Sequence, residues 1–208
     1  MAAANIRTAI FYTPEEYLTI ERDAEFRHEY IDGEIFEMAG ESLSHSRICV
    51  NLAGSARNAL KGRPCEPLSP NMKVRTSTAN LFAYPDMTIV CGEPLFHDSK
   101  KDVLINPQVI FEVLSPSTET YDRTTKFRKY QMGNETLTDY VLVSQDPPFV
   151  EHFSKQADGN WLYRSYAEIT ETMRIESIDC AFSLREIYER VEFEATEEDL
   201  VETRLEGS

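Results

Sequence analysis

Val109-Ile110-Phe111-Glu112-Val113-Leu114 is an apolar run of mainly β-branched and aromatic residues that a single charge interrupts. Such a run is typical of a central strand that is buried on both faces of its sheet. Because side chains alternate along a strand, Glu112 shares one face with Ile110 and Leu114. A lone buried carboxylate is costly unless it is paired, protonated or bound to a metal, so we expect a partner for Glu112.

The expected partner is Asp86, which follows Pro85 and leads directly into the apolar stretch 87–91. Its carboxylate is expected near the end of a neighbouring strand. Two carboxylates on adjacent strands form a hard-oxygen site that suits Mg²⁺ or Mn²⁺. Each residue alone has a structural interpretation, because Pro-Asp is a common turn dipeptide, so the hypothesis depends on the two together.

A basic helix is predicted directly after the Glu112 strand. Ser115-Pro116-Ser117-Thr118 stops the strand and offers hydroxyls for a helix cap, and the helix is expected to run to about Met132. Arg123, Lys126 and Tyr130 fall on one face of it. An ammonium on this face could complete the site by stabilising a negatively charged phosphate, although a solvated surface is the commoner role of such a face.

Upstream, the sequence predicts two helices that are separated by a hairpin. Thr13-Pro14 opens the first helix, because Thr is a favoured N-cap and Pro suits the first helical position. Asp32-Gly33 lies between short apolar runs and is a strong two-residue turn signal. Apolar residues then recur at helical spacing over 44–60, where Gly62 ends the second helix.

The other expected elements are strands and one short helix. Residues 65–76 and 84–91 are predicted to form an antiparallel pair of strands. Residues 140–144, 149–154 and 161–166 are predicted to add an antiparallel section to the sheet. A capping-box pattern from Ser183 to Glu186 predicts a short helix that reaches about Arg190.

Length and composition favour one folded domain. The chain has 208 residues, of which 41% are hydrophobic, so we expect a single domain over 1–190 and an acidic tail over 191–208 that ends in an expression-tag remnant. The net charge of −15 opposes non-specific binding to a polyanion. Residues 1–150 hold 15 basic and 21 acidic residues, so a local basic patch is still compatible with the composition.

The cysteines and the terminus bear on the cellular location. Cys49, Cys65, Cys91 and Cys180 are scattered without a C-x-x-C pair, so we expect small buried hydrophobes and neither disulfides nor a zinc ribbon. No apolar run approaches the roughly 20 residues of a membrane span. The first residues resemble neither a signal nor a transit peptide, so a cytoplasmic location is predicted.

The order of these features resembles the PD-(D/E)xK nuclease superfamily, and most closely its Uma-two family of restriction-endonuclease-like proteins. The resemblance covers about residues 12–190. The segments that carry it are YTPEEYL, HEYIDGEI, KVR, YPDMTIVCGEP, NPQVIFEVLSPSTETYDRTTKFRKY and DYVLVSQD.

The resemblance implies an α/β fold, more specifically an α+β restriction-endonuclease-like core with a mixed β-sheet flanked by helices. It also implies that Asp86 and Glu112 bind Mg²⁺ or Mn²⁺ and that a metal-activated water hydrolyses a DNA phosphodiester bond. Glu29, in HEYIDGEI, corresponds to an additional acidic residue that many members contribute. A nucleic acid, with DNA preferred, is the implied partner, and a homodimer is plausible by analogy.

The chain departs from the superfamily motif at one position. The pattern places Lys two residues after the Glu, where this chain has Leu114. Lys126 is the preferred replacement, and Lys73, on the strand before Pro85-Asp86, is the alternative. His45, at the start of the second helix, could act as a metal ligand or proton carrier, or could simply make local hydrogen bonds.

Two functional hypotheses follow. The first is a metal-dependent endonuclease that uses the residues named above. The second is a binding or scaffold protein that kept the nuclease fold and lost turnover, which the missing motif lysine and the acidic charge favour. A serine hydrolase that uses Ser115 or Ser117 is disfavoured, because no nucleophile-elbow glycines surround them.

Overall fold

The computed structural model describes residues 10–78 and 80–193. Its helical elements are α1 (Pro14–Asp23), α2 (Leu43–Leu60), α3 (Glu119–Tyr121), the π-helical segment η1 (Asp122–Lys126), α4 (Phe127–Gly133), the 3₁₀ turn η2 (Glu176–Ile178) and α5 (Leu184–Ile187). Its strands are β1 (His28–Ile31), β2 (Glu34–Glu37), β3 (Cys65–Leu68), β4 (Lys73–Arg75), β5 (Leu81–Ala83), β6 (Met87–Cys91), β7 (Val103–Leu104), β8 (Val109–Val113), β9 (Asp139–Val143), β10 (Val150–Lys155), β11 (Trp161–Tyr166), β12 (Thr172–Ile175) and β13 (Cys180–Ser183).

The main sheet has six strands in the order β11-β10-β9-β8-β6-β3. Strand β8 lies inside this sheet, antiparallel to β6 and parallel to β9, so the sheet is mixed. All five residues of β8 are buried, which confirms the prediction that the run around Glu112 is covered on both faces. The fold is thus the mixed α+β architecture that the sequence predicted.

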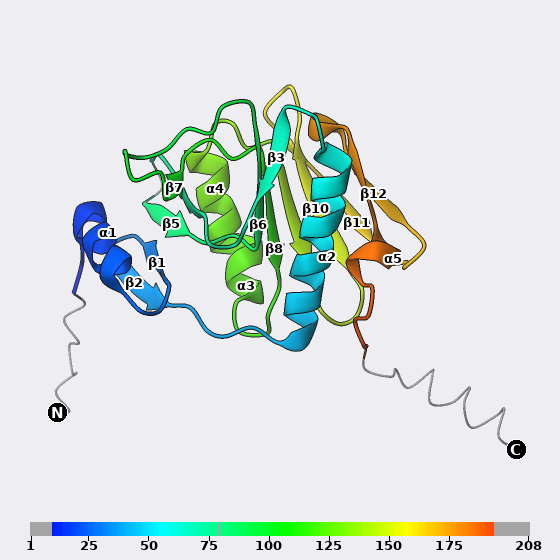
Figure 1. The fold of residues 1–208 in the computed structure, drawn as a ribbon, viewed down its shortest axis with the longest axis horizontal. Helices are drawn as coiled ribbons and strands as arrows, with labels where there is room; N and C mark the ends of the chain where they lie inside the picture. The colour runs from blue at the N-terminus through cyan, green and yellow to red at the C-terminus, as the bar shows by residue number, and fades with distance from the viewer. Residues whose placement is uncertain (1–9, 79, 194–208) are drawn as a thin grey trace, which may run out of the picture.

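Helices lie on both faces of this sheet, with α2 on one side and α4 on the other (Figure 1). On one face, α2, α5 and the hairpin of β12 and β13 pack against Val109, Phe111 and Val113. On the other face, α4 and strands β4, β5 and β7 pack against Ile110 and Leu114. Glu112 therefore lies on the α4 side of the sheet, as its register with Ile110 and Leu114 predicts.

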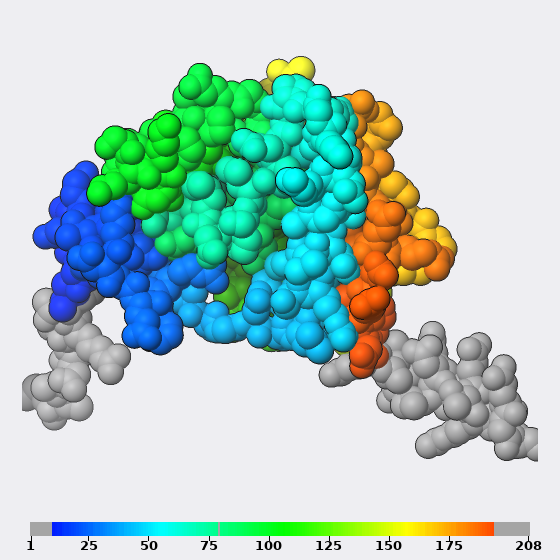
Figure 2. Space-filling model, viewed as in Figure 1, coloured from blue at the N-terminus to red at the C-terminus, as the bar shows by residue number. Residues whose placement is uncertain are grey.

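A second sheet has the strand order β2-β1-β5-β4-β7 and carries α1. Tyr17 of α1 packs against Tyr30 and Phe82 in a small aromatic core. Figure 2 shows this N-terminal segment, in blue, at one end of the molecule, with α2, in cyan, along the viewed face. The second sheet brings β1, and with it Glu29, toward the α4 side of β8.

Local sequence signals explain α1 and the first hairpin. Thr13 caps α1 through a capping box with Glu16, in which its hydroxyl accepts the Glu16 N–H at 3.2 Å. Asp32 and Gly33 both adopt positive φ, at 51° and 100°, as a tight two-residue turn between β1 and β2 requires. The predicted helix start at Thr13-Pro14 and the predicted turn at Asp32-Gly33 are confirmed.

Residues 65–76 do not form one strand, which corrects the sequence-based expectation. β3 pairs with β6 in the main sheet, whereas β4 pairs with β5 and β7 in the second sheet. The turn around 69–72, with Pro70, separates the two strands. The pattern also gave no sign of β5, which has three residues, or of the hairpin of β12 and β13, whose strands have four residues each.

Two predicted helices differ in detail. The helix after Ser115 contains the π-helical segment η1 between α3 and α4. The helix after Ser183 ends at Ile187, and the Ser183 side chain makes no capping hydrogen bond, so the predicted capping box does not form. The predicted tail at 191–208 lies mostly outside the described residues.

The cysteine expectation was wrong for one pair. Cys65 and Cys91 face each other in the register of β3 and β6 and form a disulfide. Because the two cysteines are 26 residues apart, local spacing patterns such as C-x-x-C do not predict their pairing. Cys49 and Cys180 are free thiols. Among the described helices, none combines the length and apolarity that crossing a bilayer requires.

Candidate active site

The buried charge on β8 is neutralised by the helix that follows it. Glu112 is only 4% exposed, and its Oε1 lies 2.9 Å from the Lys126 ammonium nitrogen. The Tyr130 hydroxyl lies 3.4 Å from the same oxygen. The group that contacts the Glu112 carboxylate is therefore Lys126, the preferred replacement for the missing motif lysine, and not Asp86, the partner that the sequence predicted. A second carboxylate cannot neutralise the first, whereas the ammonium can.

Lys126 also joins the two sheets. Its ammonium nitrogen lies 3.0 Å from Oε1 of Glu29, on β1, and 3.5 Å from Oδ1 of Asp122. The Tyr84 N–H donates to the same Glu29 oxygen at 3.2 Å. One ammonium thus holds carboxylates from β1, β8 and η1 in a single cluster.

Asp86 stands just before β6, at the edge of this cluster. Its Oδ2 accepts the Val113 N–H at 2.7 Å, which ties it to the residue after Glu112 on the adjacent strand. Its Oδ1 lies 3.3 Å from Nε2 of His45, in the first turn of α2. The Asp86 side chain is 17% exposed, whereas that of Glu112 is 5% exposed, so Asp86 forms the accessible side of the site.

Burial and charge dominate the electrostatics of the cluster. Burial raises the pKa of Glu112 well above its usual range; Lys126 opposes the shift, and Asp122, Asp86 and Glu29 add to it. Burial disfavours charge on Lys126, but Glu112 and Glu29 more than compensate and raise its pKa well above the ordinary value. Around Glu112, the single ammonium of Lys126 is therefore opposed by the carboxylates of Asp122, Asp86 and Glu29.

This donor set fits a hard divalent cation. Asp86 and Glu112 offer carboxylate oxygens from adjacent strands, and the excess of negative charge around them favours a bound cation. The Tyr121 hydroxyl near the cluster is also buried without a hydrogen-bond partner among the described residues. A polar ligand or an ion with its water would satisfy such a group.

The predicted residues are not all in one place. Asp86, Glu112, Lys126, Glu29 and His45 are linked by the contacts given above. Lys73 is buried elsewhere: its ammonium nitrogen lies 3.1 Å from the Tyr84 hydroxyl and 3.4 Å from Oδ2 of Asp102. Its positive charge is therefore engaged with Asp102 and not with the two carboxylates.

Sequence reasoning undervalued Asp122 and did not identify Glu41 and Cys49. Asp122 is not among the residues that the sequence predicts for the site, yet it is 4% exposed and lies against Lys126. Cys49 follows His45 by four residues on the predicted helix, where residues four apart are neighbours, and this spacing was the available signal; Glu41 lies just before the helix.

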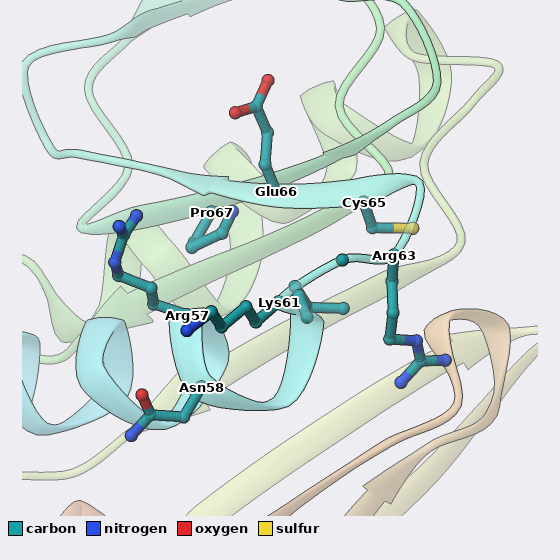
Figure 3. A pocket seen from close by; sticks show the side chains of 9 residues that line it. Arg57, Asn58, Lys61, Arg63, Cys65, Glu66 and Pro67 are labelled. Atoms are coloured by element: carbon teal, nitrogen blue, oxygen red, sulfur yellow. The ribbon is translucent and has the colours of Figure 1, made fainter.

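A hollow of about 340 Å³ lies away from these carboxylates, at the C-terminal end of α2. Arg57, Lys61 and Arg63 contribute to its lining together with Cys65 of β3 (Figure 3). Arg63 points toward the C-terminal hairpin, where its Nη2 donates to the Ile178 carbonyl at 2.9 Å. The lining of this hollow therefore holds three basic side chains and one acidic side chain, Glu66.

A mixed sheet with carboxylates on two adjacent strands and a lysine from the next helix defines a restriction-endonuclease-like protein. The chain belongs to the Uma2 family, described as "Putative restriction endonuclease", whose pattern matches residues 14–185. The family resemblance inferred from the sequence is thereby confirmed.

Known proteins support both the family and the fold. Two uncharacterized proteins of Synechocystis sp. (strain ATCC 27184 / PCC 6803 / Kazusa) are similar: slr1290 is 37% identical over 87% of this chain and 93% of its own, and sll1609 is 32% identical over 88% and 98%. A crystal structure described as a "putative nuclease belonging to DUF820", from Anabaena variabilis ATCC 29413, superposes with a TM-score of 0.69. It covers 84% of this chain and 96% of its own at 16% identity, so it bears on the fold alone.

Proposed function

We propose that this protein is a metal-dependent endonuclease that hydrolyses phosphodiester bonds of DNA. The observation that carries the proposal is the 2.9 Å contact between Lys126 and Glu112, next to an Asp86 that is hydrogen-bonded to Val113. Two carboxylates and an ammonium are thereby gathered although the motif position for lysine holds Leu114. Membership of the Uma2 family supports the same assignment.

Asp86 and Glu112 are the residues that would hold Mg²⁺ or Mn²⁺. The cation, when bound, supplies Lewis acidity that polarises the phosphate and lowers the pKa of a water. Asp86 is presented in a fixed orientation, because Val113 and His45 contact its two oxygens. Glu112 is held by the Lys126 ammonium, whose nitrogen lies 2.9 Å from Oε1 of Glu112.

Lys126 is the group that would stabilise the developing negative charge on the phosphate. Glu29 positions it, since the Glu29 carboxylate lies 3.0 Å from the ammonium and is itself held by the Tyr84 N–H. Preorganised charges of this kind act without reorganisation during the reaction. As water adds to phosphorus, the bond to the leaving sugar oxygen breaks. The water gives up one proton and the sugar oxygen takes up one, so the hydrolysis balances.

Binding of DNA has to overcome the net charge of −15. The divalent cation and Lys126 supply positive charge where the scissile phosphate would lie, and Arg57 and Lys61 of the hollow offer further phosphate contacts. The affinity for DNA is expected to be modest and to fall steeply with salt.

Cleavage of supercoiled plasmid DNA with Mg²⁺ or Mn²⁺ tests the proposal. Asp86→Asn keeps an oxygen that can accept the Val113 N–H but removes the charge, so we expect a loss of nicking of at least about 100-fold with the fold intact. Asp98→Asn is the control, because Asp98 is also ion-paired yet lies on the surface away from the cluster. Nicking by Asp86→Asn at the wild-type rate contradicts the proposal.

Calorimetry with Mn²⁺ separates an inactive site from an unsuitable DNA substrate. The wild type should bind Mn²⁺, and the double variant Asp86→Asn with Glu112→Gln should bind it at least about 10-fold more weakly. Absence of both Mn²⁺ binding and nicking in the wild type would instead support a scaffold protein that retains the nuclease fold.

A further inference from the structure

A second cluster of ligand atoms lies on the α2 side of Asp86. Nδ1 of His45 lies 3.1 Å from Oε2 of Glu41 and 3.5 Å from Sγ of Cys49. The three ligand atoms all lie within 4.8 Å of one another. In the part of the chain that the structure describes, no other group of three or more His, Cys, Asp or Glu residues meets this spacing.

The two separations from His45 are close to those of a tetrahedral metal site. Zinc binds imidazole nitrogen and carboxylate oxygen at about 2.0–2.2 Å and thiolate sulfur at about 2.3 Å, so the edges of its tetrahedron measure roughly 3.3–3.8 Å. The two contacts of His45 are close to this range. A mixed set of sulfur, nitrogen and oxygen favours zinc over Mg²⁺, which prefers oxygen ligands alone.

The backbone presents the three residues together. Ser42 caps α2, where its hydroxyl accepts the His45 N–H at 3.1 Å, and this fixes the first turn that carries His45. Cys49 follows one turn later on the same face, and Glu41 reaches back from just before the cap. Little rearrangement is needed to bring the three ligand atoms onto one ion.

The other nitrogen of His45 provides an independent indication. A histidine that binds a metal usually donates its second ring N–H to a carboxylate, which fixes the tautomer and orients the ring. Here Nε2 lies 3.3 Å from Oδ1 of Asp86, while Nδ1 faces Glu41 and Cys49. The ring is therefore oriented as a metal ligand with a carboxylate behind it.

We propose that Glu41, His45 and Cys49 form a binding site for Zn²⁺ or a similar borderline divalent cation, with a fourth position open to water. The site is distinct from the carboxylates of Asp86 and Glu112, and it is connected to them through His45. A cation bound at this site holds His45 as the Nε2–H donor to Asp86, so its occupancy determines the hydrogen bond on the accessible side of the active site.

Titration with Co²⁺ tests the proposal without any measurement of cleavage. Co²⁺ replaces zinc in such sites and, when a thiolate binds it, gives a sulfur-to-metal charge-transfer absorption. We expect this band at one equivalent in the wild type, competed away by Zn²⁺, and its loss in Cys49→Ser. Working without reductant keeps Cys65 and Cys91 joined, so that Cys49 and Cys180 are the free thiols of the described chain.

Two controls make the result specific. Cys180→Ser removes the other free thiol and should keep the band. Asp86→Asn should also keep the band, while Zn²⁺ affinity, measured by competition with a chromophoric chelator, falls about 10- to 100-fold, as loss of a carboxylate behind a ligand histidine does.

Absence of the band in the wild type, or its full retention in folded Cys49→Ser, overturns the proposal and leaves the contacts of His45 as hydrogen bonds only. Failure of plasmid nicking does not affect this test, because Cys49 lies outside the nuclease cluster and the absorption reports sulfur ligation alone.

Discussion

Lys126 is the residue on which the buried charges of this protein converge. It is 5% exposed and lies within 3.5 Å of oxygens of Glu29, Glu112 and Asp122. Burial of one of these carboxylates without the ammonium would leave an uncompensated charge, which costs several kcal/mol. The lysine therefore stabilises the fold as well as the arrangement proposed for catalysis.

Replacement of Lys126 by Met is expected to lower the free energy of unfolding by about 3–5 kcal/mol, because Glu112 then loses its cationic partner in a buried environment. Adding Glu112→Gln should recover part of this loss, since the neutral amide needs no counter-charge. Urea unfolding of the two single variants and the double variant measures the coupling. Additive losses would show that the two side chains do not interact as described.

At the residue scale, the sequence predicted that Glu112 needs a partner, but it did not correctly predict which residue that partner is. A charge within 109–114 signalled that Glu112 must be paired, and Pro85-Asp86 placed a second carboxylate nearby. Lys126 and Lys73 remained alternatives, because the choice depends on contacts between distant segments. The structure separates them: Lys73 lies against Tyr84 and Asp102, and Lys126 against Glu112.

At the scale of elements, the π-helical segment η1 is the main difference between the predicted and the observed helices. Phe127, directly after it, stacks on Tyr140 with ring centroids 4.6 Å apart, and Tyr130 is fully buried. Within η1, Asp122 and Lys126 are both buried and their side chains lie 3.5 Å apart, while the following residues pack in the core. A period of 3.6 residues, assumed throughout the sequence analysis, cannot reveal such a segment.

Helix α4 ends against the second sheet at Gly133, and a mutation tests this contact. A Cβ at Gly133 would clash with the Cβ of Thr76, so Gly133→Ala should destabilise the protein by about 1–3 kcal/mol through overpacking. At Gly54, inside α2, an added Cβ would have no other atom within 4 Å. Gly54→Ala should therefore stabilise the protein by about 0.5–1 kcal/mol. Thermal unfolding of both variants measures the contrast, and equal effects would argue against the contact.

At the scale of the whole molecule, ion pairs join segments that are distant in sequence. Glu29, Lys126 and Glu112 connect the two sheets. Arg22 of α1 pairs with Asp98 and Asp102, at 2.8 and 2.7 Å, and so connects the N-terminal helix to the loop before β7. Hydrophobic periodicity predicted most of the elements that these pairs connect, but not their assignment to two sheets, because strand pairing across long separations leaves no local pattern.

The pair of Arg22 and Asp102 should make stability depend on pH in the acid range. The hydrogen bond from Arg22, and then the charge of Lys73, lower the pKa of Asp102 to about 2 from its ordinary 3.8. A carboxyl whose pKa is lowered by folding stabilises the folded state above its unfolded pKa and loses that effect as pH falls through the folded value. The stabilisation is therefore complete above about pH 4 and disappears toward pH 2.

Melting temperatures of the wild type and Asp102→Asn across this range check the prediction. The difference between the two proteins should be constant from about pH 7 to pH 5 and should shrink steadily below about pH 4. A difference that persists unchanged at pH 2 would show that the charge of Asp102 is not responsible.

The bond between Cys65 and Cys91 closes a covalent ring of polypeptide that contains Asp86. Strands from both sheets, β3, β4, β5 and β6, belong to this ring. A protease that cuts the backbone once within it leaves both fragments attached to each other, and the peptide that carries Asp86 stays with the rest of the molecule. Under oxidising conditions, a nicked protein would therefore still migrate as a single species, and only reduction would release its two pieces.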